Sequence, residues 1–386
     1  MKKQFLFFGI IFLSMFPVGG NAQSVTGSNV VSTAVPFLAM SPESRGAAMG
    51  DAGVASSPDV NSQHWNPAKY AFAEEEEMAL SLTFTPWMRS VIEDMALSYF
   101  SFFAHVSDNQ TLSTSMRYFS YGSLLYYDTE GILQSYQNPN EFALDVAYAT
   151  KLSREWSASV ALRYIRSDMA STVVDGLEMS AANSYAADVA FFYQKSRRSG
   201  YRRHTKRFGM VVSNIGAPIS YDDGRTRNFL PANLRVGGGY EMIVDRYNKW
   251  SFVLDFNKLL APTSNYIQTT NSDGVIIYTD SSADFSSMEA IFRSFTDAPG
   301  GFKEELQEIT TSLGVEYLYD DRFALRTGFF NENKNKGGRQ YVTMGAGLNL
   351  DTFTFDLSYL YTLSTVSPLE NTIRFTLSLD LGRWIK

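Results

Sequence analysis

The feature that most constrains this chain is an alternation of apolar and polar residues, repeated in segments of about ten residues. In residues 156–167, one row is mostly apolar and the other is mostly small and polar. Residues 371–381 repeat the pattern, with Ile373 and Phe375 on one row and Arg374 between them. Successive side chains of a β-strand point to opposite faces. The pattern therefore predicts strands with one apolar face and one polar face.

About fourteen segments show this pattern, an even number, as in the single-chain barrels of bacterial outer membranes. They are expected near residues 78–86, 95–106, 111–121, 142–152, 156–167, 184–194, 206–215, 232–242, 249–257, 309–319, 322–330, 341–349, 352–361 and 371–381.

The connections between the segments alternate in length. Those after odd-numbered segments are mostly long, including 122–141, 168–183, 216–231 and 258–308, whereas those after even-numbered segments are short. Bacterial barrels join their strands by short periplasmic turns and longer external loops. We therefore expect an all-β protein, an antiparallel transmembrane β-barrel of the outer membrane, multi-pass, with long loops at the cell surface. The alternative, a large secreted β-protein, gives no reason for this parity.

The N-terminus predicts export. Lys2 and Lys3 precede an apolar run that ends near Val18, and small residues follow, so residues 1–22 are expected to be a signal peptide cleaved before Gln23. The chain has no cysteine, which excludes a disulfide scaffold and thiolate chemistry. A net charge of −7 gives no indication of nucleic-acid binding.

Residues 23–77 do not alternate and are expected to form a separate element. The string from Ser44 to Val60 is rich in glycine and alanine, which favours tight turns and close packing. A barrel of this size encloses a lumen that its own side chains do not fill. We expect residues 23–77 to lie in the lumen as a plug, and residues 78–386 to form the barrel.

Several strings resemble a known family. Arg45, Gly46, Gly50, Asn66 and Pro67 follow the order of the plug motif of FadL-type outer-membrane transport proteins. Further strings resemble the PorV branch, the outer-membrane protein of the type IX secretion system. They are NIGAPISY at 214–221, FLPANLRVGGGYE at 229–241, DFNKLLAPT at 255–263, DAPGGFKEELQE at 297–308 and PLENTIRFTLS at 368–378.

The resemblance implies a set of partners. They are a large outer-membrane translocon barrel, the C-terminal signal domains of secreted cargo, and a surface sortase and attachment complex. The lipid bilayer and lipopolysaccharide would surround the barrel.

No catalytic or metal-binding constellation is evident. The three histidines, His64, His105 and His204, are expected in the plug, near a strand end and in a turn. None is placed on an external loop, where barrel hydrolases hold their catalytic histidine. There is no HExxH or EF-hand spacing, and the acidic run Glu74–Glu77 is better explained as a solvated segment. We expect no enzymatic activity, no metal and no cofactor.

A basic turn and a long loop are the remaining candidates. Lysines and arginines crowd residues 195–207, on the predicted periplasmic side, where they would dock an acidic partner or contact lipid head groups. Residues 258–308 form the longest external loop, and loops of this length usually carry function. A short helix is expected at 288–295. The loop contains four phenylalanines expected to bind a partner: Phe285, Phe292, Phe295 and Phe302. The alternative is that the loop folds back over the barrel mouth and has a structural role only.

Two functions remain open at this point. One is a secretion component that binds proteins through its external loops. The other is a FadL-like carrier of hydrophobic small molecules, which would require an apolar lumen. Arginines and aspartates of the predicted inner row are expected to pair with one another or with the plug. This inner row is charged, which favours the first function. It holds Ser81, Thr83, Arg117, Asp145, Lys151, Arg163, Asp188, Arg235, Asp255, Arg326, Asp356 and Arg374.

Overall fold

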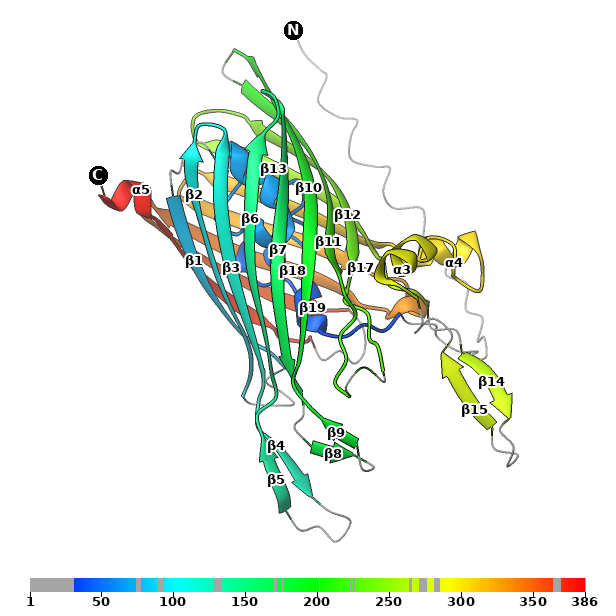
Figure 1. Ribbon diagram of the computed structural model, residues 1–386. Coiled ribbons are helices and arrows are strands. Elements are labelled where there is room, and N and C mark those ends of the chain that lie inside the picture. Colours follow the sequence, from blue (N-terminus) through cyan, green and yellow to red (C-terminus); the bar gives the residue numbers. More distant parts are fainter. Residues whose placement is uncertain are drawn as a thin grey trace.

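The alternating segments form the wall of a barrel (Figure 1). The computed structural model describes residues 31–73, 78–88, 94–127, 133–169, 172–174, 177–200, 202–222, 224, 226–263, 266–270, 276–280, 285–363 and 369–385. Within these residues, fourteen antiparallel strands pair in a closed ring. They are β1 Met78–Pro86, β2 Met95–Ser107, β3 Gln110–Tyr121, β6 Asn140–Lys151, β7 Trp156–Asp168, β10 Ala182–Ser199, β11 Arg202–Gly216, β12 Asn233–Ile243, β13 Asn248–Leu259, β16 Thr310–Tyr319, β17 Phe323–Asn331, β18 Gln340–Leu350, β19 Phe353–Thr362 and β20 Ile373–Asp380.

The ring closes between its first and last strands. β1 pairs with β20 from Ala79 opposite Asp380 to Phe84 opposite Phe375. All other barrel strands pair with the barrel strands that precede and follow them in sequence. Closure leaves no free edge, as a sheet that spans a bilayer requires. The fold class predicted from the sequence is confirmed.

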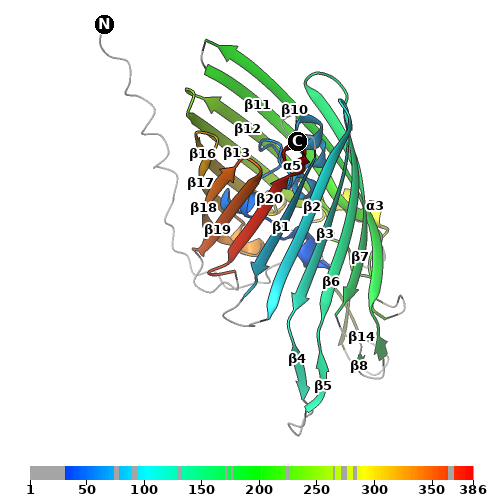
Figure 2. The ribbon, with the colours of Figure 1, turned by 90° about the vertical axis from the view of Figure 1, so that its left-hand side faces the viewer.

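The two rows of each strand face different surroundings. On β7, Trp156, Val160 and Leu162 are 42%, 52% and 67% exposed, whereas Ser159 and Arg163 are buried. The exposed apolar row faces outward, around the circumference that Figure 2 shows from the side. The apolar row thus faces lipid and the polar row faces the lumen.

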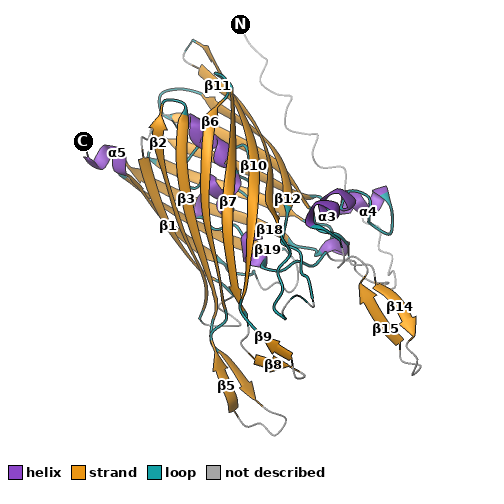
Figure 3. Cartoon of the chain, in the orientation of Figure 1, coloured by secondary structure: helices purple, strands orange, loops and turns teal. Residues whose placement is uncertain are grey.

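The two ends of the barrel differ. One, the turn end, carries short connections such as 108–109, 152–155 and 320–322, and the other, the loop end, carries long ones such as 260–309. The sequence placed the loop-end connections in loops, but short hairpins form within three of them in the described part of the chain (Figure 3). They are β4 Leu124–Tyr127 with β5 Leu133–Gln137, β8 Thr172–Val174 with β9 Leu177–Met179, and β14 Tyr266–Thr270 with β15 Ile276–Asp280.

Short helices lie before, between and after the strands. The first four, which precede β1, lie inside the barrel (Figure 1). In the part that the structure describes, none is long and apolar enough to cross a membrane. The helices are the 3₁₀ helix η1 Pro36–Ala39, α1 Ser44–Ala48, α2 Ser62–Trp65, the 3₁₀ helix η2 Pro67–Phe72, α3 Ser287–Arg293, α4 Phe302–Gln307, the 3₁₀ helix η4 Lys334–Lys336 and α5 Leu381–Ile385.

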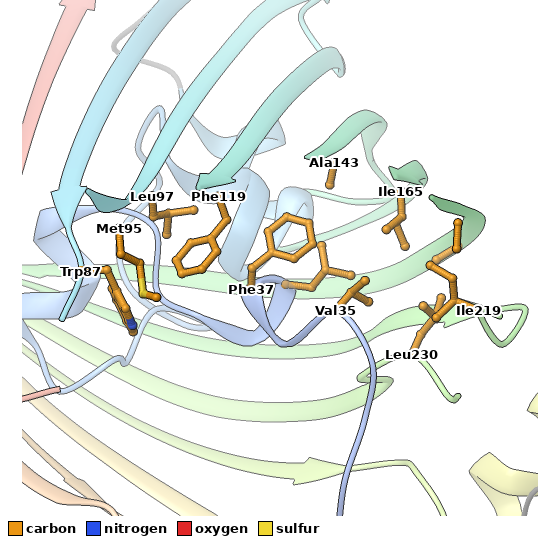
Figure 4. Packing of buried hydrophobic residues seen from close by; sticks show 13 residues of the cluster. Val35, Phe37, Trp87, Met95, Leu97, Phe119, Ala143, Ile165, Ile219 and Leu230 are labelled. Carbon is orange, nitrogen blue, oxygen red and sulfur yellow. The ribbon is translucent and has the colours of Figure 1, made fainter. Parts of the chain in front are cut away.

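An apolar core joins the N-terminal part of the chain to the wall at the loop end. Figure 4 shows Phe37 beside Phe119 and Leu97, with Trp87 on one side of them and Val35 on the other, all in one cluster. All five side chains are buried. The chain before β1 therefore enters the lumen near the loop end of the barrel.

A second core lies at the turn end. Val60, Tyr70 and Ala73 pack against Phe103 and Ala149 of the wall. Residues 33–73, here called the inner segment, thus follow the inner face of the wall from one end to the other. The predicted signal peptide and the acidic run 74–77 lie outside the described residues.

Candidate functional site

The last helix of the inner segment is fixed by Asn66 and Pro67. The Oδ1 of Asn66 accepts a hydrogen bond from the amide of Ala68 at 3.0 Å. Its Nδ2 donates to the carbonyls of Val54 at 3.2 Å and Phe191 at 3.0 Å. Pro67 occupies the first helical position, where a missing N–H has no cost. Because Phe191 lies on β10, the Asn-Pro pair attaches the inner segment to the wall.

Arg45 attaches the first half of the inner segment. Its Nε and Nη2 both donate to Glu316 of β16 at 2.9 Å. Its Nη1 donates to Asp59 at 2.6 Å. A two-pronged bond between arginine and a carboxylate is among the strongest polar contacts in proteins. Arg45 therefore holds α1, the part of the inner segment around Asp59 and the wall together.

Glu316 also belongs to a series of buried ion pairs along the wall. Arg326 donates to Glu316 at 2.7 Å and to Asp356 at 2.5 Å. Glu316 was not among the residues predicted for the inner row, although alternation along residues 309–319 places it there. Its partner Arg45 lies 271 positions away in sequence, so the pairing itself had no local signal.

A second ionic cluster lies on the opposite part of the wall. Arg163 pairs with Asp145 and Asp188 and also donates to Asn214. The prediction that Arg163, Asp188 and Asp356 face inward and are paired is confirmed.

Arg374 departs from the predicted pairing. It faces inward as predicted and is 2% exposed. No carboxylate among the described residues forms an ion pair with it. Its guanidinium instead lies 5.7 Å from the centre of the Trp87 ring, a cation–π contact that replaces the expected salt bridge.

Glycines let the inner segment fold tightly. Gly46 and Gly53 both lie against the ring of Trp65, where a side chain would overlap the indole. Gly50 has a φ of +72°, a conformation that favours glycine, and its backbone lies against that of Phe329. These positions explain part of the glycine-rich string.

The wall carries matching glycines. Gly314, Gly328 and Gly345 lie on the adjacent strands β16, β17 and β18. An added methyl group at these positions would overlap Met49, the backbone of Met49 and Gly50, and Ala48, respectively. The wall and the inner segment are thus in direct backbone contact along this line, which we call the glycine line.

The closing strands also bind the inner segment. The amide of Ser44 donates to Thr376 of β20 at 3.0 Å. Thr376 in turn lies 2.8 Å from the hydroxyl of Thr83 on β1. The inner segment is therefore hydrogen-bonded to the seam at which the barrel closes.

A cavity of about 480 Å³ remains between the inner segment and the wall at the loop end. Trp87, Phe330 and Leu360 supply apolar lining, and Arg235 and Arg374 supply positive charge. The volume falls within the range of about 300 to 1,000 Å³ that is usual for small-molecule pockets.

The long loop is clamped to the barrel by ion pairs. Lys258 at the end of β13 contacts Glu305 at 2.8 Å and Glu308 at 2.5 Å. Lys336 contacts Glu304 at 2.6 Å and Glu308 at 3.0 Å. Burial alone would lower the pKa of Lys336, but the hydrogen bonds to Glu304 and Glu308 outweigh burial and raise this pKa. These two lysines fix α4 and the end of the loop at the barrel rim.

The loop phenylalanines differ in exposure. Phe292 and Phe302 are 69% and 77% exposed, and Phe295 is 44% exposed. Phe285 is partly buried, with the Arg293 guanidinium 4.5 Å from its ring centre. The helix expected at 288–295 is present as α3, one or two residues earlier. Whether these phenylalanines bind a partner stays a prediction.

The histidines do not come together. His64 lies in the inner segment, its carbonyl accepting from Arg235 at 3.2 Å. His105 contacts the carbonyl of Ala73 at 2.9 Å at the turn end. His204 lies within β11, not in a turn as expected, because β11 extends further than its apolar residues indicated. Among the described residues, no group of three or more potential ligands could hold a metal ion.

A closed barrel with an outward apolar row and an occupied lumen defines an outer-membrane β-barrel protein. Residues 23–266 match the family described as type IX secretion system protein PorV. The match covers more than half of the chain, and the chain belongs to the PorV family. A comparison with curated proteins gave no significant match.

Solved structures of similar shape include a toluene transporter, a monoaromatic hydrocarbon channel and a FadL homologue. The toluene transporter TodX of Pseudomonas putida is 12% identical, with 88% of this chain and 99% of that chain covered and a TM-score of 0.49. The monoaromatic hydrocarbon channel CymD is 12% identical, with 90% of this chain and 97% of that chain covered and a TM-score of 0.48. A Pseudomonas aeruginosa FadL homologue is 10% identical, with 88% of this chain and 99% of that chain covered and a TM-score of 0.44. Likenesses this distant do not bear on what the chain binds.

Proposed function

We propose that this protein is a non-enzymatic component of type IX secretion that binds other proteins through its surface loops. Membership of the PorV family supports a role in that system. The proposed partners are the translocon barrel and the C-terminal signal domains of cargo, which the protein passes to a surface attachment complex. Residues 23–77 act as a plug in the lumen.

One observation carries the proposal: exposed aromatic side chains stand on a loop that the barrel holds in place. Large apolar groups exposed outside the membrane usually mark a partner surface. Lys258 and Lys336 fix the loop end, so Phe292 and Phe302 are presented without a large ordering cost. Anchored aromatic residues are typical of binding hot spots.

The test replaces Phe292, Phe295 and Phe302 together by alanine. Loss of a single interface anchor commonly costs about 2 kcal/mol or more, so the affinity for the partner should fall at least about thirtyfold and partner recovery should fall with it. The measurements are barrel assembly, secretion of cargo and recovery of the translocon with the purified protein. Lys303→Ala, at an exposed position beside Phe302, is the matched control. Normal assembly with unchanged secretion and unchanged recovery would refute the proposal.

The second candidate is a carrier of hydrophobic small molecules, which the cavity at the loop end favours. The charged lining of this cavity argues against the carrier function, since Arg235 and Arg374 line the same space. Native mass spectrometry of protein from solubilised outer membrane separates the two functions. A bound lipid with no co-purifying protein supports the carrier. A large barrel or secreted cargo in the same sample supports the secretion component.

A further inference from the structure

The hairpin of β10 and β11 carries an unusual concentration of positive charge at the turn end. β10 continues past Trp156, the first residue of its neighbour β7, as far as Ser199. β11 begins at Arg202 and pairs with β10 along the whole extension. Figure 1 shows this hairpin projecting beyond the neighbouring strands at that end. Its tip therefore stands outside the rim of the barrel.

The register places like charges opposite each other in this hairpin. Lys195 pairs with Lys206, and Arg198 pairs with Arg203. Directly opposed side chains of an antiparallel pair lie on the same face and close together, so like charges there are destabilising. A hairpin built in this way gains stability when an anion binds it.

Few carboxylates compensate this charge. Lys195 contacts Glu155 at 2.5 Å. In the part of the chain that the structure describes, no carboxylate forms an ion pair with Arg197, Arg202 or Lys206. All three side chains are exposed. They are available to a ligand outside the chain.

The cations continue the lipid-facing row of the same strands. Tyr193 on β10 and Phe208 on β11 are paired and face outward, and Trp156 on β7 stands opposite Tyr193. Their rings form part of an aromatic belt of the kind found at bilayer interfaces. Two residues further along, the same row reaches Lys195 opposite Lys206.

The next positions on this outward row are Arg197 and then Ser199, which pairs with Arg202. An outward row that passes from aromatic belt to cations over a few residues places those cations at the level of lipid head groups. An acidic protein would instead be expected to meet the tip from the barrel axis.

We propose that the outward face of the β10–β11 hairpin binds the phosphate groups of anionic phospholipids in the membrane leaflet at the turn end. Lysine and arginine bind phosphate through charge-assisted hydrogen bonds. The site consists of Lys195, Arg197, Arg202 and Lys206, with His204 on the same face. It is separate from the lumen and from the long loop.

The experiment uses the full-length protein in nanodiscs of phosphatidylcholine, with and without phosphatidylglycerol. Hydrogen exchange is measured at the amides of residues 195–206. Phosphatidylglycerol is expected to slow this exchange about tenfold or more, and raised salt is expected to reverse the effect because salt screens exposed charge. Retained phosphatidylglycerol is counted by native mass spectrometry.

The test variant is Arg197→Ser with Arg202→Ser and Lys206→Ser. The matched control removes three exposed arginines of other turns at the same rim, Arg154→Ser with Arg246→Ser and Arg322→Ser. The proposal requires that the test variant loses the slowing and the retained lipid, while the control keeps both. Equal behaviour of the two variants overturns it. So does recovery of an acidic protein that depends on the hairpin while lipid retention does not.

Discussion

Replacing Arg45 by methionine should release the first half of the inner segment from the barrel wall. Arg45 is 13% exposed and makes two hydrogen bonds to Glu316, one to Asp59 and two to Ser57. Removing one partner of a buried ion pair typically costs about 3 to 5 kcal/mol. Glu316 keeps Arg326, and Asp59 keeps the hydroxyl of Ser62. We therefore expect the lower end, about 3 kcal/mol.

A loss of this size raises the population of the detached segment roughly a hundredfold, since each 1.4 kcal/mol is about a factor of ten. Two measurements report it. Hydrogen exchange at the amides of residues 44–59 should accelerate by a similar factor. In planar bilayers, the variant should show frequent openings if the inner segment is a plug, whereas the wild type stays closed.

Arg339→Met is the matched control because it also removes one arginine from an ion pair. The Arg339 side chain is 52% exposed in its pair with Glu332. Exposed pairs contribute about 0 to 1 kcal/mol, so exchange at residues 44–59 should stay unchanged. Arg45→Lys keeps the charge and guards against a failure to fold, and its effect should be intermediate. Heat-dependent gel mobility confirms that each barrel is folded. Exchange in Arg45→Met equal to that of the control would refute the reasoning.

Other variants test the remaining contacts of the inner segment and the loop. Gly328→Val should lower the temperature at which the barrel loses its heat-dependent gel mobility, because the valine side chain would overlap the backbone of Met49 and Gly50. An unchanged temperature would contradict the close backbone contact along the glycine line. Lys336→Met should leave that temperature unchanged but increase proteolysis of the 258–308 loop several-fold, because Lys336 no longer holds Glu304 of α4 and the following Glu308 at the rim. A loop as resistant as in the wild type would show that these ion pairs are not needed.

The wall of the barrel could be predicted because its signal is local. Alternation needs only neighbouring residues, and it placed Arg163 and Asp188 on the inner row before any partner was known. The ends of β10 and β11 were missed for the same reason. Residues 195–199 and 202–205 are polar or charged on both rows, so the alternation stops although the pairing continues. Strand length beyond the lipid band is fixed by backbone pairing, which leaves no apolar pattern.

The contacts of the inner segment could not be predicted in detail. The motif residues Arg45 and Asn66 were singled out, but their partners Glu316 and Phe191 lie far away in sequence. Arg374 shows the opposite case. Its inward direction followed from alternation, whereas its contact with Trp87 depends on a residue just beyond β1 that no strand pattern includes.

The hydrogen bonds at the closing seam bear on the order of assembly. Ser44 contacts Thr376 on the last strand, and Thr376 contacts Thr83 on the first. The inner segment is translated and exported before either strand, and its backbone lies against the glycine line without room for side chains to slide past. If the ring closed first, the inner segment would have to enter the narrow lumen and form these hydrogen bonds and close backbone contacts afterwards. Assembly is simpler if the wall forms around the inner segment, with the joining of β20 to β1 as the final step.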